Sequence, residues 1–221
     1  MKKLSELPLR DRKHAKTKLA LMNNAVKLLE FKTLDEISVK EICDSVMISE
    51  GTFFNYFSKK SDLLIYFIKL WTIEVIWRAR KNSKKHKGLK VIETVFELTF
   101  SGKTIGNFGL MNEIIAYFAR LRESVPNYSL TLAEKLMAFP DLKGIEEIEE
   151  GGLNIVFIPF LMEAVELGEL PPNTDINLVS ISLSSIFLGV PLIMKDATGD
   201  EIVKMYLSQL SILWAGLNSQ K

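Results

Sequence analysis

Apolar residues recur along the chain with the three- and four-residue spacing of amphipathic helices. The first such stripe runs through Ala15, Leu19, Met22, Val26 and Leu29. The segment from Thr33 to Ile37 interrupts it. Ser38, with Glu41 three residues later, then has the spacing of a capping box and begins a second helix. Because no run alternates between apolar and polar residues as a half-buried strand does, the pattern predicts an all-α chain.

Two short helices follow one another closely in the N-terminal third. The first ends near Val46, and the next begins at Ser49, a good N-cap for a helix from Glu50 to Tyr56. A long helix over about 62–81 comes after it. Two helices joined by a short turn, with a further helix on either side, are typical of a helix-turn-helix unit.

The helical pattern divides the chain into two predicted domains. Residues 10–60 hold the helix-turn-helix unit, and residues 82–221 form a second helical domain. Glycines and prolines mark the helix ends in this second domain. Its last helix carries an apolar stripe formed by Val203, Leu207, Leu210, Trp214 and Leu217.

An uncharged segment, Asn177 to Met194, precedes this last helix. Its 18 residues come close to the number needed to span a bilayer, about 20. The segment also contains four serines and Pro191, which favour a helix buried in a protein interface over a membrane span. The last two helices, at about 175–194 and 200–217, carry more apolar surface than one chain easily buries. We therefore expect them to form a four-helix homodimer interface, with no membrane contact.

Charge is distributed unevenly between the two predicted domains. Residues 1–87 carry 19 Lys and Arg against 10 Asp and Glu, whereas residues 88–221 carry 9 against 17. A basic N-terminal third joined to an acidic remainder suggests that only the first part meets a polyanion such as DNA. The same distribution is also compatible with a charged surface that has no partner.

The chain offers few residues for catalysis or metal binding. Its single cysteine, Cys43, lies on the apolar face of the second helix, which favours a core residue in a reducing, cytoplasmic location. His14 and His86 lie in basic stretches, away from any Cys, Asp or Glu at metal-ligand spacing. No nucleophile elbow or phosphate loop occurs, and the charged N-terminus is unlike a signal peptide. We therefore expect no enzyme, no cofactor and no metal.

The stretch from Ser38 to Asp62 reads SVKEICDSVMISEGTFFNYFSKKSD. It resembles the N-terminal signature of the tetracycline-repressor (TetR) family of regulators. The positions in register are Ile48, Ser49, Gly51, Thr52, Phe53, Phe54, Tyr56, Phe57 and Lys60. A second stretch, Glu163 to Asp175, resembles the link that precedes the family's dimerisation helices. The resemblance implies a ligand-responsive repressor that binds a near-palindromic operator in double-stranded DNA as a homodimer.

This resemblance, together with residue type, assigns the DNA contacts. Ser49 caps the recognition helix, Gly51 lets the backbone approach the DNA, and Asn55 and Tyr56 can reach base edges or a phosphate. The basic flanks, from Arg10 to Lys18 and at Lys59 and Lys60, are expected to supply most of the affinity. The predicted DNA-binding set is Arg10, Arg12, Lys16, Ser38, Ser49, Gly51, Thr52, Asn55, Tyr56 and Lys60.

The chain departs from the family pattern at three positions. Met47 stands where the turn often has Gly, Phe54 where the family usually has Tyr, and Thr33 where Gly usually separates the first two helices. The change at Phe54 removes a hydroxyl that typically meets a phosphate. Phe53 and Phe57 are expected to pack inward as scaffold, so base reading rests on the remaining polar residues and on DNA shape.

Aromatic residues and methionines crowd the middle of the chain. The family resemblance implies an apolar pocket for a small, largely apolar effector, although ordinary core packing explains the same residues. The predicted pocket residues are Phe96, Phe100, Phe108, Met111, Phe118, Phe157 and Phe160. The alternatives are an architectural DNA-binding protein without an effector, and an enzyme in the helical domain.

Overall fold

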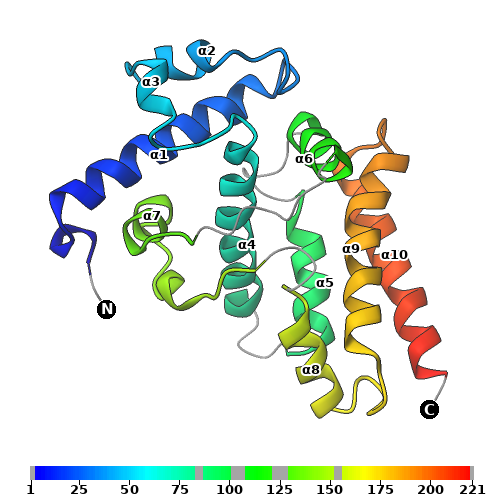
Figure 1. Cartoon of the computed structure of the whole chain (residues 1–221). Helices are drawn as coiled ribbons and strands as arrows, with labels where there is room; N and C mark the ends of the chain where they lie inside the picture. Colours follow the sequence, from blue (N-terminus) through cyan, green and yellow to red (C-terminus); the bar gives the residue numbers. More distant parts are fainter. Residues whose placement is uncertain (1–2, 83–86, 101–107, 121–128, 152–155, 220–221) are drawn as a thin grey trace. The chain divides into compact units, whose positions relative to one another are not determined.

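The computed structural model describes residues 3–82, 87–100, 108–120, 129–151 and 156–219. Within these ranges the chain forms helices and turns and no strand (Figure 1). The predicted all-α fold class is confirmed.

The helices group into two compact units. The first consists of residues 1–73 and 107–150, and the second of residues 74–106 and 151–221. The chain therefore passes from one unit to the other three times. The contiguous division expected from the sequence, with domains at 10–60 and 82–221, does not coincide with these units, because residues 107–150 fall in the same unit as residues 1–73.

The first unit is built around α1 (Leu9–Leu28). α2 (Val39–Asp44) packs against α1 and α3 (Glu50–Phe53), and α4 (Asp62–Asn82) begins in this unit. α7 (Leu132–Ala138) packs against α1 and two 3₁₀ turns, η1 (Leu4–Glu6) and η2 (Ile145–Glu147). α6 (Phe108–Arg120) completes the unit, and its last residue pairs with Asp35 at 3.0 Å. This exposed ion pair contributes little to stability.

Local sequence explains where the short helices begin. At α2, the Ser38 hydroxyl accepts a hydrogen bond from the Glu41 amide, while the Glu41 carboxylate accepts one from the Ser38 amide. Thr131 and Glu134 form the same capping box at α7. Each box satisfies amide groups that the first turn of a helix leaves without a partner. The capping box predicted at Ser38 is confirmed.

The second unit contains the end of α4, α5 (Leu89–Leu98), α8 (Ile158–Glu166), α9 (Ile176–Ile193) and α10 (Gly199–Asn218). α10 lies beside α9 and α5, and α8 packs against α5 and α9 (Figure 1). The bounds of α9 and α10 agree closely with the two predicted C-terminal helices.

An aromatic cluster forms the centre of the second unit. The ring of Phe96 lies 5.0 Å from that of Tyr206 and 5.6 Å from those of Phe157 and Phe187, measured between centroids. The Tyr206 hydroxyl donates to the carbonyl oxygen of Phe187 at 2.6 Å. Burial raises the pKa of this hydroxyl, because the charged form would lose its hydration.

α9 is also the one helix in the described part of the chain that is long and apolar enough to cross a membrane. It packs against α8 and α10, and Val179, Leu183 and Phe187 on one of its faces are buried in the unit.

Candidate nucleic-acid interface

The turn between α2 and α3 contains a strained residue. Met47 has a φ of 56°, which makes it the one described residue other than glycine in the left-handed region. Its side chain is 91% exposed and gains nothing from packing. The sequence departs from the family pattern at this position, and the structure shows the consequence: methionine adopts a backbone conformation that glycine adopts without strain.

α3 begins with a well-formed cap. The Ser49 hydroxyl accepts from the Thr52 amide at 3.2 Å and lies 2.8 Å from the Thr52 hydroxyl. Both predicted DNA-binding side chains are therefore used in fixing the first turn of the helix. Gly51 and Asn55 are exposed, as predicted contacts must be. The carboxylate of Glu50, which sequence reasoning missed, is exposed beside them.

The helix itself is shorter than the sequence predicts. α3 ends at Phe53, and residues 54–56 continue as a turn in which Asn55 and Tyr56 donate to the carbonyl oxygens three residues earlier. Such bonds tighten the chain relative to an α-helix. Phe53 and Phe57 are buried, which confirms their predicted scaffold role, whereas Phe54 is 53% exposed.

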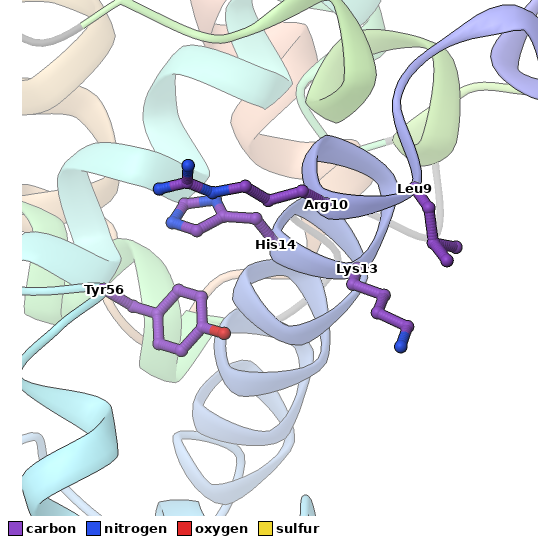
Figure 2. Close-up of a pocket in the computed structure, with 5 residues that line it drawn as sticks. All are labelled: Leu9, Arg10, Lys13, His14 and Tyr56. Carbon is purple, nitrogen blue, oxygen red and sulfur yellow. The ribbon is translucent and has the colours of Figure 1, made fainter.

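A basic pocket lies where the N-terminal end of α1 meets the turn after α3 (Figure 2). It has a volume of about 510 Å³ and is lined by Leu9, Arg10, Lys13, His14 and Tyr56. The rings of His14 and Tyr56 are 4.7 Å apart between centroids. Two cationic side chains, an imidazole and a phenol hydroxyl are groups that bind phosphate oxygens.

The pocket brings together Arg10 and Tyr56, both in the predicted DNA-binding set. It also contains Lys13, from the predicted basic flank, and His14, which the predicted set does not include. Lys13 and His14 follow Arg10 on α1 at spacings of three and four, so all three share a face of the helix. That spacing is a usable signal for the α1 side of the pocket. It does not reveal Tyr56, whose ring reaches α1 through the tertiary fold.

Two other predicted cations on the N-terminal flank differ in their surroundings. The Arg12 guanidinium is half-buried and donates from Nε to the carbonyl oxygen of Leu7 at 3.1 Å. It thereby holds the chain that enters α1. Lys16 is exposed. Lys18, at the end of the predicted basic flank, is buried and paired with Glu134, so it is no part of the exposed basic surface.

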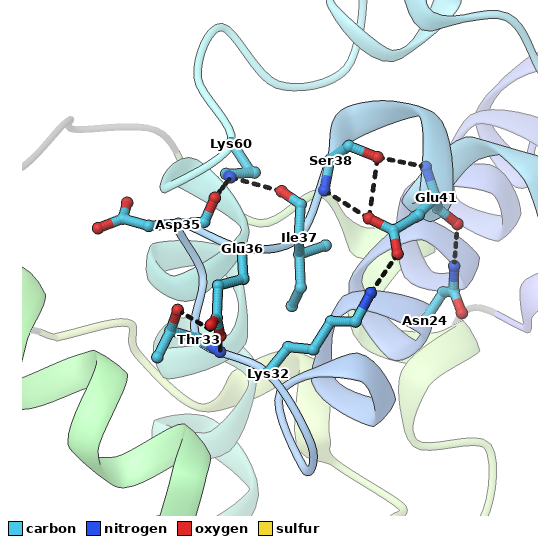
Figure 3. Close-up of polar contacts among 9 residues, drawn as sticks. All are labelled: Asn24, Lys32, Thr33, Asp35, Glu36, Ile37, Ser38, Glu41 and Lys60. Atoms are coloured by element: carbon cyan, nitrogen blue, oxygen red, sulfur yellow. Dashed lines mark hydrogen bonds and ion pairs between the residues drawn. The ribbon is translucent and has the colours of Figure 1, made fainter.

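Lys60 supports the loop between α1 and α2 (Figure 3). Its ammonium donates to the carbonyl oxygens of Ile37 at 2.5 Å and Asp35 at 3.4 Å. A phosphate contact at Lys60 was expected from the sequence and stays a prediction. The geometry shows instead a residue that is already committed to backbone acceptors.

Polar contacts fix α2 against α1 in the same region (Figure 3). Asn24 donates from Nδ2 to the carbonyl oxygens of Glu41 and Ile42, at 3.2 Å and 2.9 Å. Lys32 pairs with the Glu41 carboxylate. This ion pair, together with the hydrogen bond that the carboxylate accepts from the Ser38 amide, lowers the pKa of Glu41 from its usual 4.5 to about 2. The Ser38 hydroxyl, a predicted DNA contact, lies 2.9 Å from the same carboxylate.

The predicted effector residues do not fall into one unit. Phe96, Phe100, Phe157 and Phe160 belong to the second unit, whereas Met111 and Phe118 belong to the first. The side chain of Phe108 lies outside the described residues. Phe96 and Phe157 are packed into the aromatic cluster of the second unit, and Phe160 lies under the Arg80 guanidinium at 5.1 Å.

The described residues contain no cluster of three or more His, Cys, Asp or Glu that could hold a metal ion. Cys43 is buried, and burial raises the pKa of its thiol. This agrees with the interpretation of Cys43 as a core residue.

The arrangement of α2, the Met47 turn and a capped, exposed α3 beside a basic pocket defines a helix-turn-helix DNA-binding protein. Comparison with known families agrees. Residues 21–67 match the family model of the bacterial regulatory proteins of the tetR family, so this N-terminal part of the chain is similar to the DNA-binding domain of those regulators. No curated protein matches the chain.

Three solved structures are similar to the chain at low sequence identity. The ketosteroid transcriptional regulator KstR2 of Mycobacterium tuberculosis is 14% identical to this chain. The match covers 90% of this chain and 94% of KstR2, with a TM-score of 0.49. A TetR family transcriptional regulator from Chloroflexus aurantiacus J-10-FL is 16% identical. The match covers 96% of this chain and 95% of that regulator, with a TM-score of 0.47. A gamma-butyrolactone receptor (ArpA-like protein) is 12% identical. The match covers 90% of this chain and 98% of that receptor, with a TM-score of 0.44.

Proposed function

We propose that the protein is a ligand-responsive repressor that acts in the cytoplasm and binds a near-palindromic operator as a homodimer. The observation that carries the proposal is the exposed start of α3 beside the basic pocket at the N-terminal end of α1. A recognition helix that enters the major groove needs cationic groups next to it to hold the flanking phosphates.

The proposed contacts divide by chemistry. Asn55 is exposed and carries both a donor and an acceptor, so it is the best candidate for reading a base edge. Arg10 and Lys13, with Tyr56, would hold a phosphate in the pocket. Gly51 would let the backbone approach the duplex. Because α3 contains no Lys or Arg, paired hydrogen bonds to guanine are not expected from it.

Dimerisation through α9 and α10 is supported by apolar residues that the chain leaves exposed. These residues are Leu178, Ile181, Leu192 and Ile193 on α9, and Met205 and Ile212 on α10. A face of this kind on two adjacent helices is typical of an interface between copies. A symmetric dimer presents two copies of α3, so each operator half should repeat the other in inverted order.

The proposal includes release from DNA by a small effector. An effector shifts DNA affinity only through different affinities for the binding and non-binding states. The rings around Phe96 are already in close contact, which favours the alternative of a regulator without an effector. Native mass spectrometry of the purified dimer separates the two: a retained small molecule supports the effector.

The test of DNA recognition is selection of duplexes from a randomised library by the full-length protein, followed by titration of the selected duplex and of random DNA. Light scattering on the free protein measures its oligomeric state. The proposal requires a dimer and a selected site with inverted symmetry. A monomer, or equal affinity for selected and random duplexes, would refute it.

A further inference from the structure

The exposed side of α3 carries an aromatic ring. Phe54, which caps the C-terminal end of the helix, is 53% exposed, whereas Phe53 beside it and Phe57 are buried. Among the exposed residues from Ser49 to Asn55, all of which the structure describes, Phe54 has the one apolar side chain. It is therefore the residue through which this side of α3 can make an apolar contact.

The Phe54 ring is held from behind by the core. It lies edge-on against the ring of Phe53, with 5.4 Å between the centroids and 86° between the planes. The Phe53 ring is fully buried and lies 5.7 Å from that of Phe57. Because one side of the Phe54 ring packs on this buried pair, its exposed side has a defined orientation. A contact made by that side costs little further side-chain entropy.

The residue one helical turn before Phe54 leaves room beside the ring. Gly51 precedes Phe54 by three positions, the spacing of side chains that share a helix face. A Cβ atom at Gly51 would have just the Ser49 hydroxyl oxygen within 4 Å, at a distance of 3.9 Å. Helical side chains lean toward the N-terminus of their helix, so Phe54 leans toward this open space. A small group can therefore lie beside the ring and over the backbone at Gly51.

The charges near Phe54 disfavour a phosphate as its contact. Glu50, four positions earlier on the same face, has an exposed carboxylate, and α3 contains no Lys or Arg. Arg10 and Lys13, the cations of the basic pocket, lie instead beside Tyr56. Phenylalanine also has no hydroxyl to donate to a phosphate oxygen. This side of α3 therefore suits the edges of bases better than the backbone of DNA.

The major groove exposes one kind of apolar group, the C5-methyl group of thymine. An aromatic ring that covers this methyl group removes apolar surface of both partners from water. The same ring over the amino group of cytosine or the O6 atom of guanine would bury a polar group without a partner, which is costly. A ring at this position therefore discriminates in favour of thymine.

We propose that Phe54 is a specificity-determining residue that covers the C5-methyl group of one thymine in each operator half-site. The methyl group would lie beside the ring, in the open space over Gly51. This inference rests on the proposed DNA-binding function and adds an apolar contact to the polar one assigned to Asn55. It requires a thymine in each half-site that is recognised by its methyl group.

Replacement of thymine by uracil in the selected duplex tests the inference with the wild-type protein. Uracil lacks the methyl group and keeps every hydrogen-bonding group, so a scan of one position at a time isolates the apolar contact. Fluorescence anisotropy should show about a fourfold loss of affinity at one thymine of each half-site, the change expected when one methyl group loses its burial. Equal affinities at every position, or a selected site without thymine, would overturn the inference.

Substitutions at Phe54 complete a double-mutant cycle with the uracil duplex. Phe54→Ala should bind the thymine and uracil duplexes equally, whereas Phe54→Tyr keeps the ring and should keep the fourfold difference. Any effect of uracil on DNA shape is the same for each protein, so the cycle isolates the contact between ring and methyl group. If Phe54→Ala keeps the wild-type difference, another residue contacts the methyl group and the inference is overturned.

The matched control is Phe31→Ala, which removes the same side chain from a residue that is 85% exposed in the loop between α1 and α2. It should keep the difference between thymine and uracil. Circular dichroism must show each variant folded; if Phe54→Ala unfolds, Phe54→Gln takes its place with the same expectation. A wild-type protein that selects no duplex would refute the DNA-binding proposal itself. A selected duplex that is bound without regard to its methyl groups would refute this inference alone.

Discussion

The ammonium of Lys60 lies 2.5 Å from the carbonyl oxygen of Ile37, a residue that is itself fully buried. The contact joins the turn before α4 to the loop before α2. It gives Lys60 a structural task at a position where the sequence predicts a phosphate contact.

The first prediction is that Lys60→Met destabilises the protein. Removal of the ammonium leaves the carbonyl oxygen of Ile37 without this donor, at a cost of about 1–3 kcal/mol in the free energy of unfolding. Urea denaturation measures the loss. Lys59→Met, at an exposed neighbouring position, should leave stability nearly unchanged. If both variants are equally stable and only DNA affinity falls, the phosphate role is the correct one.

The second prediction concerns the strained turn. Met47→Gly should raise the free energy of unfolding by about 0.5–1 kcal/mol, because glycine removes the left-handed strain but loses more chain entropy on folding. No packing is lost, since the methionine side chain is 91% exposed. Met47→Ala keeps the Cβ atom and should give no such gain. A destabilised glycine variant in urea denaturation would show that the conformation is not strained.

The third prediction concerns Gly88, which precedes α5 with a φ of 51°. A Cβ atom there would lie 2.1 Å from Oε2 of Glu169, the carboxylate that accepts from the Leu89 amide. Gly88→Ala should therefore cost more than the about 1–2 kcal/mol of left-handed strain alone. Gly144→Ala is the control, because its φ is 85° and the space around it is open. Equal unfolding free energies for the two variants would contradict the clash.

The fourth prediction follows from the pKa of Glu41, which the Lys32 ion pair lowers from 4.5 to about 2. The unfolded chain then binds more protons than the folded one between these values, so the contribution of Glu41 is complete above pH 4.5 and is lost toward pH 2. The stability advantage of wild type over Glu41→Gln should shrink over that window. Thermal unfolding at stepped pH measures it, and Lys32→Met should weaken the dependence. A constant difference between wild type and Glu41→Gln would contradict the lowered pKa.

Local features of the fold are predictable from the sequence. The capping box at Ser38, the N-cap at Ser49 and the inward packing of Phe53 depend on residues within a few positions of each other. The end of α3 is the exception among local features. The sequence predicts a helix to Tyr56, but the chain tightens after Phe53.

The tertiary part of the site is not predictable in this way. Lys60 finds its acceptor 23 positions away, and Lys18 pairs with a glutamate of α7. A lysine on a basic flank and a lysine in a buried ion pair look the same in a sequence, because burial decides between them. For the same reason the predicted effector residues, chosen by type alone, fall into two units.

The fifth prediction separates phosphate contacts from base contacts. Lys13→Ala removes a cation from the basic pocket, so it should weaken binding to all duplexes and reduce the slope of log affinity against log salt by about 0.9. Asn55→Ala should leave that slope unchanged and reduce the preference for the selected duplex. Lys27→Ala removes an exposed charge at the opposite end of α1 and serves as the control.

Fluorescence anisotropy at several salt concentrations, with the selected and a random duplex, measures both quantities for each variant. The slope counts the phosphate charges that the protein neutralises, and the affinity ratio reports base reading. If Lys13→Ala and Lys27→Ala change the slope equally, the pocket contacts no phosphate. If Asn55→Ala keeps the affinity ratio of wild type, base reading lies elsewhere on the exposed surface around α3. In that case Thr52 and Tyr56, whose side chains are half-buried beside Asn55, are the next residues to substitute.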